Sequence, residues 1–196
     1  MLGTFRIVSD LGDMSIVPAS YAQLDALLRR RHAAVMEARP DKNPGAYKLQ
    51  ANRAGNTIFV DPGLVPGTLE QGFEFYRALE EPFQKAVFMM ILVSEVHPFA
   101  DGNGRVARIM MNAELVAAGQ ERIVIPTAYR TDYLGALKAF SRNGRMEPVI
   151  RMLDRAQRYT GLIDWSTFER ARAMLEETDA FADGEDAKLR IPNPTE

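Results

Sequence analysis

The chain has 196 residues, of which 46% are apolar and 26% charged, and its formal net charge at pH 7 is −2. This length suggests one domain with modest additions, and the apolar content is ample for a buried core. The near-neutral charge argues against binding to nucleic acid or an anionic membrane surface. The absence of cysteine excludes disulfides and cysteine metal sites, and the N-terminus lacks the pattern of a secretory signal. We expect a cytoplasmic protein, with secretion as an effector left open.

Residues 1–19 show no clear period and are expected to form an arm, in which Thr4 to Val8 could be a short strand. A helix is expected to open at Pro18 and Ser20, with an apolar face. Arg29 to His32 form a basic patch on this helix. The patch indicates either a partner-binding surface or an ordinary solvated face. The residues of the apolar face are Leu24, Leu27, Leu28, Ala34 and Val35.

A β-hairpin is expected after the breaker cluster at residues 40–45. Gly55-Asn56 is a plausible hairpin turn, and Thr57 to Val60 are typical strand residues. An isolated hairpin is marginally stable, so it should pack on another element. A helix should follow from Thr68 to about Glu80. Its inward side chains are expected to be Leu69, Phe73, Phe75, Tyr76 and Leu79.

Two apolar helices should form the centre of the molecule. Residues 86–93 are apolar without a break, which predicts a helix buried on all sides, because eight residues are far too few to span a membrane. Pro98 should end this helix and hold His97 in an extended conformation. The second helix should begin near Asn103 or Gly104 and end at Gly119.

Three further helices are predicted in the C-terminal part. They cover Arg130 to Arg142, Glu147 to Tyr159, and a last helix that Asp164 would cap and that runs to about Thr178. The apolar residues of the first of these helices are Tyr133, Leu134, Leu137 and Phe140. The residues predicted to be buried in the second are Val149, Ile150, Met152 and Leu153. Residues 181–196 read as a polar tail.

The loop between the two central helices carries a compact set of reactive groups. His97 has an ordinary pKa near 6.5, so its neutral form is available to take a proton. Asp101 could bind Mg²⁺, which usually takes one or two carboxylates together with substrate phosphates. The first turn of the next helix offers free N–H groups to an anion. Arg105 and Arg108 are three residues apart, so both lie on the face near that anion.

The run from His97 to Arg108 resembles the signature of the Fic family, His-Pro-Phe-x-(Asp/Glu)-Gly-Asn-Gly-Arg-x-x-Arg, and matches it at every fixed position. The resemblance implies an all-α fold, a helical bundle with a short β-hairpin flap over the active site. We place this core at residues 20–160, after an N-terminal arm at 1–19 and before a C-terminal helix and tail at 161–196.

The resemblance also implies an activity: transfer of AMP from Mg-ATP to a Tyr, Thr or Ser hydroxyl of a target protein, with pyrophosphate leaving. His97 would be the catalytic base and Asp101 the ligand of Mg²⁺. The flap would bind the target protein. The remaining implied site residues are Gly102, Asn103, Gly104, Arg105 and Arg108 for the phosphates, Tyr133 for the nucleoside, and Thr57, Ile58 and Phe59 in the flap.

Two alternatives stay open: a catalytically silent nucleotide-binding module, and a family variant with another nucleotide donor. Many Fic proteins are inhibited by a glutamate in the pattern Ser/Thr-x-x-x-Glu-Gly/Asn. No glutamate here precedes Gly or Asn, and the nearest approach, Ser9 to Asp13, has the wrong acid. We therefore expect inhibition by a separate antitoxin-like protein, a degenerate inhibitory segment, or a chain that is a fragment of a longer protein. A homo-oligomer is also possible.

Overall fold

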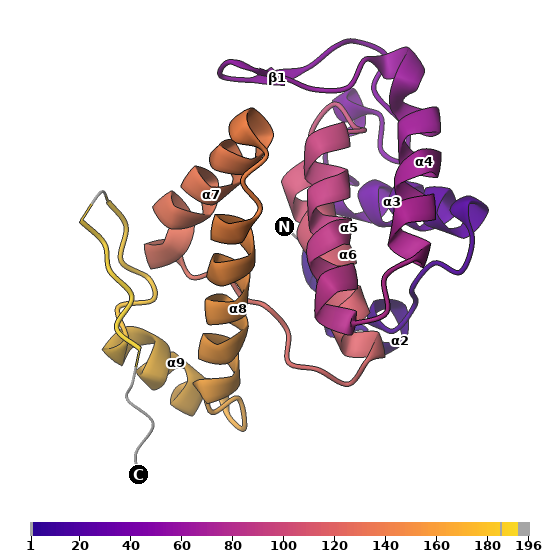
Figure 1. Cartoon of the computed structure of the whole chain (residues 1–196). Helices are drawn as coiled ribbons and strands as arrows, with labels where there is room; N and C mark the ends of the chain where they lie inside the picture. Colours follow the sequence, from indigo (N-terminus) through magenta and orange to yellow (C-terminus); the bar gives the residue numbers. More distant parts are fainter. Residues whose placement is uncertain (1, 185, 192–196) are drawn as a thin grey trace. The chain divides into compact units, whose positions relative to one another are not determined.

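The computed structural model describes residues 2–184 and 186–191, and helices are their main secondary structure (Figure 1). The prediction of an all-α fold with one short hairpin is confirmed. In the N-terminal part lie α1 (Leu2–Ser9), α2 (Leu11–Met14), α3 (Tyr21–Val35), the 3-10 turns η1 (Pro40–Lys42) and η2 (Pro62–Leu64), strands β1 (Arg53–Ala54) and β2 (Thr57–Ile58), α4 (Val65–Arg77), α5 (Pro82–Val96) and α6 (Asn103–Ala117). The C-terminal part holds η3 (Thr127–Tyr129), α7 (Arg130–Asn143), α8 (Glu147–Leu162) and α9 (Phe168–Glu177).

The chain divides into two compact units, Met1–Gln120 and Glu121–Glu196. This division falls inside the range 20–160 that the sequence assigned to one core. The helix pair α7 and α8 shares a unit with α9, and the N-terminal arm shares a unit with the central helices. The proposed limits at residues 19 and 160 stay predictions about domain organisation.

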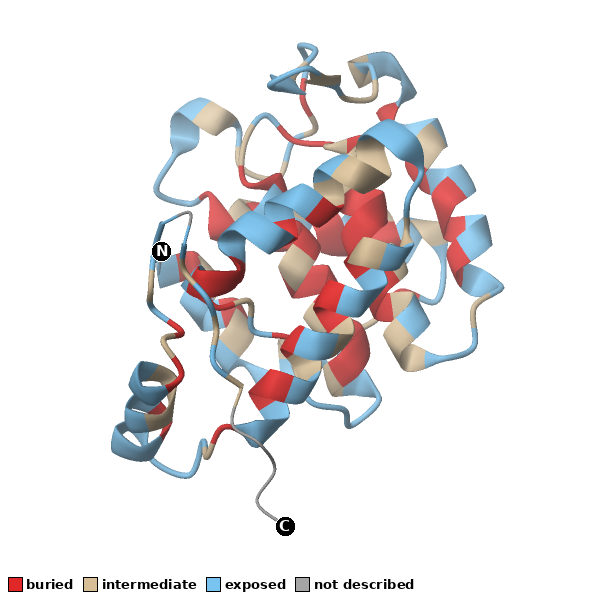
Figure 2. Cartoon of the chain, turned by 60° about the vertical axis from the view of Figure 1, so that its left-hand side comes forward, coloured by how far each residue is buried: buried red, intermediate tan, exposed pale blue. Residues whose placement is uncertain are grey.

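Helices α5 and α6 form the centre of the first unit and pack along each other. The burial colours in Figure 2 show that buried residues lie along the faces where helices meet. Residues 86–93 of α5 are apolar on every side, which fits their position between α6 and α4. Helix α6 also contacts α1, α2 and α3. Helix α6 ends where Gly119 adopts a left-handed conformation (φ +67°) and Gln120 N–H donates to the Leu115 carbonyl at 2.8 Å. Gly119 is therefore the predicted end signal of this helix.

The N-terminal arm differs from the prediction, because residues 4–8 are helical and not extended. Helix α1 packs against α3. A Cβ atom at Gly3 would lie 1.7 Å from the carbonyl oxygen of Ala34, so only glycine permits this close approach. The helix is fixed by a tertiary contact that local alternation of residues does not encode.

The predicted basic patch on α3 is wrong for Arg31 and His32, which are both 0% exposed. The Arg31 Nε donates to Asp13 Oδ1 at 3.0 Å, and its Nη2 donates to the carbonyl oxygens of Asp13 (2.6 Å) and Ile16 (3.0 Å). Arg30, which is exposed, also contacts Asp13. A buried guanidinium thus connects α3 to Asp13 in α2 and to Ile16 just after α2, and the Asp13 carboxylate is occupied in this pairing.

Other sequence predictions were wrong in detail. Helix α4 begins at Val65 and not at Thr68, and Phe75 is 61% exposed because the buried face follows Leu69, Phe73 and Tyr76. Ile150, which was predicted to be buried, is 42% exposed. Helix α9 is capped by the Thr167 side chain, which accepts from Arg170 N–H, and not by Asp164.

In the second unit, α7 packs on α8, and a small apolar cluster joins α8, α9 and the segment after it. Its buried members are Tyr159, Ile163, Ala171 and Ala180. Within residues 2–184 and 186–191, no helix combines the length and apolar character that a membrane span needs.

The Arg31 contacts predict a large effect of Asp13→Ala. The substitution leaves a buried guanidinium without its carboxylate, a change that costs about 3–5 kcal/mol in comparable buried pairs. We expect the free energy of unfolding in urea to fall by roughly 3 kcal/mol. The matched control is Glu74→Ala, which removes an exposed ion pair with Arg77 worth less than about 1 kcal/mol. A loss for Asp13→Ala as small as the control would contradict this account of Arg31.

A second prediction concerns Glu114, a buried carboxyl on α6 that accepts a hydrogen bond from Tyr76 Oη (3.0 Å) on α4. Burial raises the pKa of Glu114 to about 7. Between an unfolded pKa of 4.5 and this value the folded chain holds a proton that the unfolded chain has lost, so stability is lost as pH rises through 7.

Glu114→Gln mimics the protonated form at every pH and should lack this dependence. From pH 5 to pH 8, the unfolding free energy of the wild type should fall by about 2–3 kcal/mol relative to that of the variant, measured in urea at both pH values. Both proteins contain the same histidines, whose contributions cancel in the comparison. A constant difference across this range would show that Glu114 has an ordinary pKa.

Candidate active site

The motif residues lie where α5 ends and α6 begins, at one end of the central helix pair. Residues 97–102 form the loop, and residues 103–108 form the start of α6. Because α5 and α6 pack along each other, the end of one helix and the start of the other are held side by side. The two helices therefore fix both ends of the loop.

His97 is the residue that ends α5, and its backbone is left-handed (φ 50°, ψ 56°). The prediction of an extended conformation is wrong here. Its N–H still donates to the Val93 carbonyl at 3.0 Å, so His97 completes the helix and then turns the chain. The imidazole is half-buried, and its Nδ1 lies 3.2 Å from the Ser94 carbonyl oxygen. A proton on Nδ1 donating to this oxygen leaves Nε2 as the basic nitrogen of the neutral ring.

The surroundings of His97 favour the neutral imidazole. Burial lowers the pKa of His97 below its ordinary value of 6.5, and the nearby charge of Lys48 lowers it further. The hydrogen bond to Ser94 and the charge of Asp101 act in the opposite direction. The ring of Phe59 stacks face to face on the imidazole, with centroids 3.8 Å apart and planes 7° apart. At neutral pH the ring is therefore a base ready to accept a proton.

The loop is closed by the side chain of Asn103, which is buried and turned inward. Its Oδ1 accepts from Phe99 N–H at 2.9 Å, and its Nδ2 donates to the Phe99 carbonyl at 2.8 Å. Phe99 is buried, and its ring stacks on His32 of α3 with centroids 3.7 Å apart. The amide side chain of Asn103 thus fixes the shape of the loop. Its backbone N–H remains part of the first turn of α6.

His32 supports the loop from beneath. Its Nδ1 accepts from Gly45 N–H at 3.0 Å, which leaves the proton on Nε2 to donate to the Asp101 carbonyl at 3.1 Å. Burial lowers the pKa of His32 to about 4. A neutral imidazole therefore holds the backbone of Asp101 in place.

The start of α6 has the features of an anion site. Gly102 has φ +79°, and its N–H donates to Asp101 Oδ1 at 2.6 Å. The N–H groups of Asn103 and Gly104 have no hydrogen-bond partner within residues 2–184 and 186–191. Gly104 is exposed, so its missing side chain leaves room for a phosphate at these groups and at the positive end of the helix.

Arg108 points back toward this helix start, and Arg105 lies beside it. The Nη1 of Arg108 is 3.7 Å from the position that a Cβ of Gly104 would take. The Nη2 of Arg105 lies 3.1 Å from the Met36 sulfur, and both guanidinium groups are half-buried. Two N–H groups and the Arg108 guanidinium thus lie together at the start of α6, where a phosphate chain could bind, and Arg105 is in the same helical turn.

The carboxylate of Asp101 fits a Mg²⁺ ion that is shared with a nucleotide. It is half-buried beside the helix start, and its Oδ1 is held by Gly102 N–H. In the described part of the chain, no group of three or more His, Cys, Asp or Glu side chains could hold a metal ion. A single carboxylate suits Mg²⁺, which completes its octahedron with phosphate oxygens and water.

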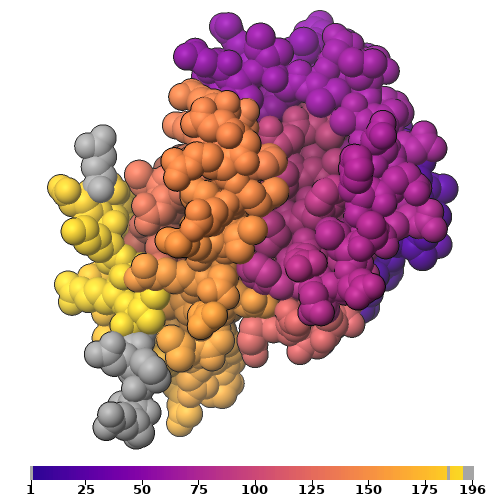
Figure 3. Space-filling view, viewed as in Figure 1, coloured from indigo at the N-terminus to yellow at the C-terminus, as the bar shows by residue number. Residues whose placement is uncertain are grey.

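The predicted hairpin forms, with Arg53 opposite Ile58 and Ala54 opposite Thr57, although the strand ends at Ile58 and not at Val60. Ile58 is 79% exposed, and Figure 3 shows this segment at the surface. The residues before the hairpin are fastened to the motif loop. Lys48 N–H donates to Pro98 O at 2.9 Å, Lys48 Nζ to Val96 O at 3.3 Å, and Asn52 Nδ2 to Phe99 O at 2.9 Å.

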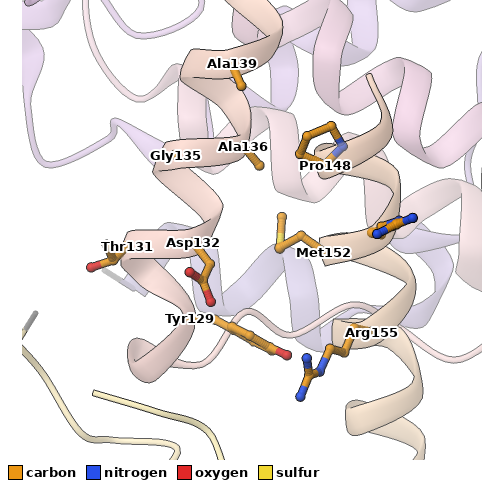
Figure 4. Close-up of a pocket in the computed structure, with 10 residues that line it drawn as sticks. Tyr129, Thr131, Asp132, Gly135, Ala136, Ala139, Pro148, Met152 and Arg155 are labelled. Carbon is orange, nitrogen blue, oxygen red and sulfur yellow. The ribbon is translucent and has the colours of Figure 1, made fainter. Parts of the chain in front are cut away.

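Tyr133 is buried on α7 and belongs to the second unit. A cavity of about 560 Å³ lies in that unit between α7 and α8 (Figure 4). It is bordered by Tyr129, Arg151 and Arg155, and Tyr133 is not among its lining residues. This cavity contains none of the predicted site residues, and the role of Tyr133 stays a prediction.

Three residues of the site were not found from the sequence: His32, Lys48 and Asn52. For His32 a signal was present, because Leu24, Leu28, His32 and Val35 recur at helical spacing and place position 32 on the buried face. Lys48 and Asn52 had no such signal. Their partners are backbone carbonyls more than 40 residues away, and sequence pattern does not report such contacts.

The geometry at Gly102 predicts that Gly102→Ala is strongly destabilising. A Cβ there would lie 2.8 Å from the Met36 sulfur, and the left-handed backbone adds strain of about 1–2 kcal/mol. We expect the urea unfolding free energy to fall by roughly 2 kcal/mol or more. In Gly104→Ala the nearest atom to the new Cβ is 3.7 Å away, so this variant should be at least as stable as the wild type. Equal losses in both variants would contradict the left-handed loop.

Comparison with known proteins agrees with this geometry. Residues 23–115 match the family described as Fic/DOC. Two relatives named "Protein adenylyltransferase Fic", from Drosophila persimilis and Drosophila melanogaster, are each 30% identical over 151 residues, which is 70% of this chain and 30% of the relative. The chain thus spans about a third of the length of these relatives.

Solved structures show the same fold. Fic-1 from C. elegans (residues 134–508) aligns with a TM-score of 0.63 and 20% identity over 84% of this chain and 50% of that chain. A Fic domain containing signaling protein from Bacteroides thetaiotaomicron has a TM-score of 0.60 and 18% identity, over 81% of this chain and 65% of that chain. IbpAFic2 in complex with adenylylated Cdc42 has a TM-score of 0.55 and 20% identity, over 69% of this chain and 47% of that chain. Residues 23–115 therefore form a domain of the Fic/DOC family.

Proposed function

We propose that this chain is a protein adenylyltransferase that transfers AMP from Mg-ATP to a Ser, Thr or Tyr hydroxyl of another protein. The observation that carries the proposal is the pairing of a neutral His97 with an anion site at the start of α6, held on one short loop. The relatives named adenylyltransferase are about three times as long as the region they share with this chain. Because the match covers only that part of them, the activity is a proposal for this chain.

The reaction follows from the positions of these groups. His97 Nε2 takes the proton of the acceptor hydroxyl as its oxygen attacks the α-phosphorus of ATP. A new P–O bond forms to the target, and the bond between the α-phosphorus and the bridging oxygen breaks, so pyrophosphate leaves. The N–H groups of Asn103 and Gly104, together with Arg105 and Arg108, bind the phosphate oxygens and align the leaving group.

Asp101 would hold the Mg²⁺ ion that accompanies ATP. The ion supplies positive charge to the phosphate oxygens. The part of this chain is to keep the Asp101 carboxylate in place through the N–H of Gly102 and the carbonyl contact of Asp101 with His32.

The target protein would bind at the hairpin. Its exposed strands offer main-chain hydrogen bonds to an extended segment of the target, a mode that needs little side-chain recognition. Thr57, Ile58 and Phe59 are the residues we assign to this contact. The related IbpAFic2 was solved with adenylylated Cdc42, which is an example of a protein product on this fold. A separate inhibitory protein and a contact of Tyr133 with the nucleoside are further parts of the proposal.

The test uses ATP labelled at the α-phosphate, incubated with the chain and with lysates as a source of targets. We expect a covalently labelled protein band in the presence of Mg²⁺ and its loss when EDTA removes the ion. His97→Ala should reduce labelling by about 100-fold or more, because it removes the base. Asp101→Asn should reduce it at limiting Mg²⁺.

Phe75→Ala is the matched control for these variants, since this exposed residue lies outside the site, and it should label normally. Labelling with γ-labelled ATP in place of α-labelled ATP would identify a phosphate-transferring enzyme. Binding of ATP without any labelled band, or equal labelling by His97→Ala, would favour a nucleotide-binding module and overturn the proposal.

A further inference from the structure

We infer that Phe59 is a positioning residue for His97, whose ring fixes the plane of the imidazole so that Nε2 faces the acceptor hydroxyl. The inference rests on the proposed function, in which His97 is the base. Phe59 itself touches neither nucleotide nor metal in this role; it acts through the imidazole.

The imidazole needs a second restraint. Its Nδ1 has one hydrogen-bond contact, to the Ser94 carbonyl at 3.2 Å, and this contact fixes one atom of the ring. The phenyl ring of Phe59 lies parallel to the imidazole within 7° at a centroid distance of 3.8 Å. A parallel stack constrains the orientation of a whole plane. The two contacts together leave Nε2 pointing in one direction.

Phe59 is itself held by the loop that it helps to organise. Its N–H donates to the Asn52 carbonyl at 3.3 Å, and the Asn52 side chain donates to the Phe99 carbonyl at 2.9 Å. Lys48 Nζ donates to Asn52 Oδ1 at 2.7 Å. A path of contacts therefore runs from Phe99 through Asn52 and Phe59 to His97. The path closes on itself, because His97 lies two residues before Phe99 in the chain. These contacts hold the phenyl ring of Phe59 in a defined position relative to the motif loop, in addition to the restraint from the hairpin.

The place of Phe59 in the sequence gives this contact a consequence. Phe59 directly follows β2, whose residue Ile58 is 79% exposed. A target segment that pairs with the hairpin fixes the residue adjacent to the stack. The alignment of the base thus depends on the same segment that receives the target, so a bound target also secures the geometry of the base.

Phe59 is suited to a clean test because it is only half-buried and lies outside the main core. The chain has two histidines, His97 and His32. With ¹³C-labelled histidine, NMR resolves one titration for each, and His97→Ala assigns them. His32 is the internal control, because Phe59 does not stack on it and its pKa of about 4 should stay unchanged.

Three substitutions at Phe59 distinguish two effects on His97: the orientation imposed by a flat ring, and the exclusion of water by an apolar side chain. Phe59→Ala admits water to the imidazole, so the pKa of His97 should rise toward 6.5, although Lys48 and Asp101 still act on it. The kcat for AMP transfer should fall roughly tenfold to a hundredfold, with the KM for ATP little changed. Phe59→Leu keeps apolar cover without a flat face, so it should restore the pKa but not kcat. Phe59→Tyr keeps the stacking face and should restore both.

Phe75→Ala is the matched control, and it should change neither the His97 titration nor kcat. An unmoved His97 pKa in Phe59→Ala, or a wild-type kcat in Phe59→Leu, would overturn the inference. A wild-type chain without transfer activity would overturn the proposed function instead. The titration of Phe59→Ala would then decide whether the stack exists: a raised His97 pKa supports it, and an unchanged one refutes it.

Discussion

The site depends on the two hydrogen bonds that join the Asn103 side chain to the main chain of Phe99, at 2.9 and 2.8 Å. One amide satisfies both the N–H and the carbonyl of a residue four positions earlier. The chain must therefore make a tight turn between the end of α5 and the start of α6. Because the amide is buried, an alternative loop shape would leave polar groups unpaired, which is costly. This closure brings His97 and the N-terminus of α6 to the same end of the first unit.

A second layer, from α3, supports the turn. His32 stacks on Phe99 and holds the Asp101 carbonyl, while Met36 occupies the space next to Gly102. Burial lowers the pKa of His32 to about 4, so at neutral pH its Nδ1 carries no proton and can accept from Gly45 N–H. Arg31 directly precedes His32 in α3, and its buried pairing with Asp13 holds the helix that carries His32 in place.

The hairpin combines a fixed base with an exposed tip. Lys48 and Asn52 fasten the segment before it to the carbonyls of Val96 and Phe99, and Phe59 returns to the loop through its ring. Between these points Arg53, Ala54 and Ile58 are exposed, and Thr57 is half-buried. In the function we propose, this arrangement lets the exposed strands accept a strand of the target while the motif loop keeps its shape.

The sequence by itself determined the helical class, the central pair of helices, the hairpin and the identity of the motif. These follow from short-range information: apolar periodicity, the end signal at Gly119, the Gly55-Asn56 turn, and twelve consecutive residues with a specific pattern. The residue types of His97, Asp101 and Arg108 also indicated their chemistry, because base, carboxylate and guanidinium are properties of single side chains.

Only the tertiary structure decided which of these groups are supported and how. The left-handed backbone of His97 is possible because α5 and α6 hold both ends of the loop, and the sequence pointed to an extended residue there. The sequence also did not predict the inward turn of the Asn103 side chain, the stacking of Phe59 on His97, or the burial of Arg31. The contact of Arg31 with Asp13 spans 18 residues, and that of His32 with Asp101 spans 69. A sequence pattern reports which side chains are present, whereas distances between remote residues are set only when the helices pack.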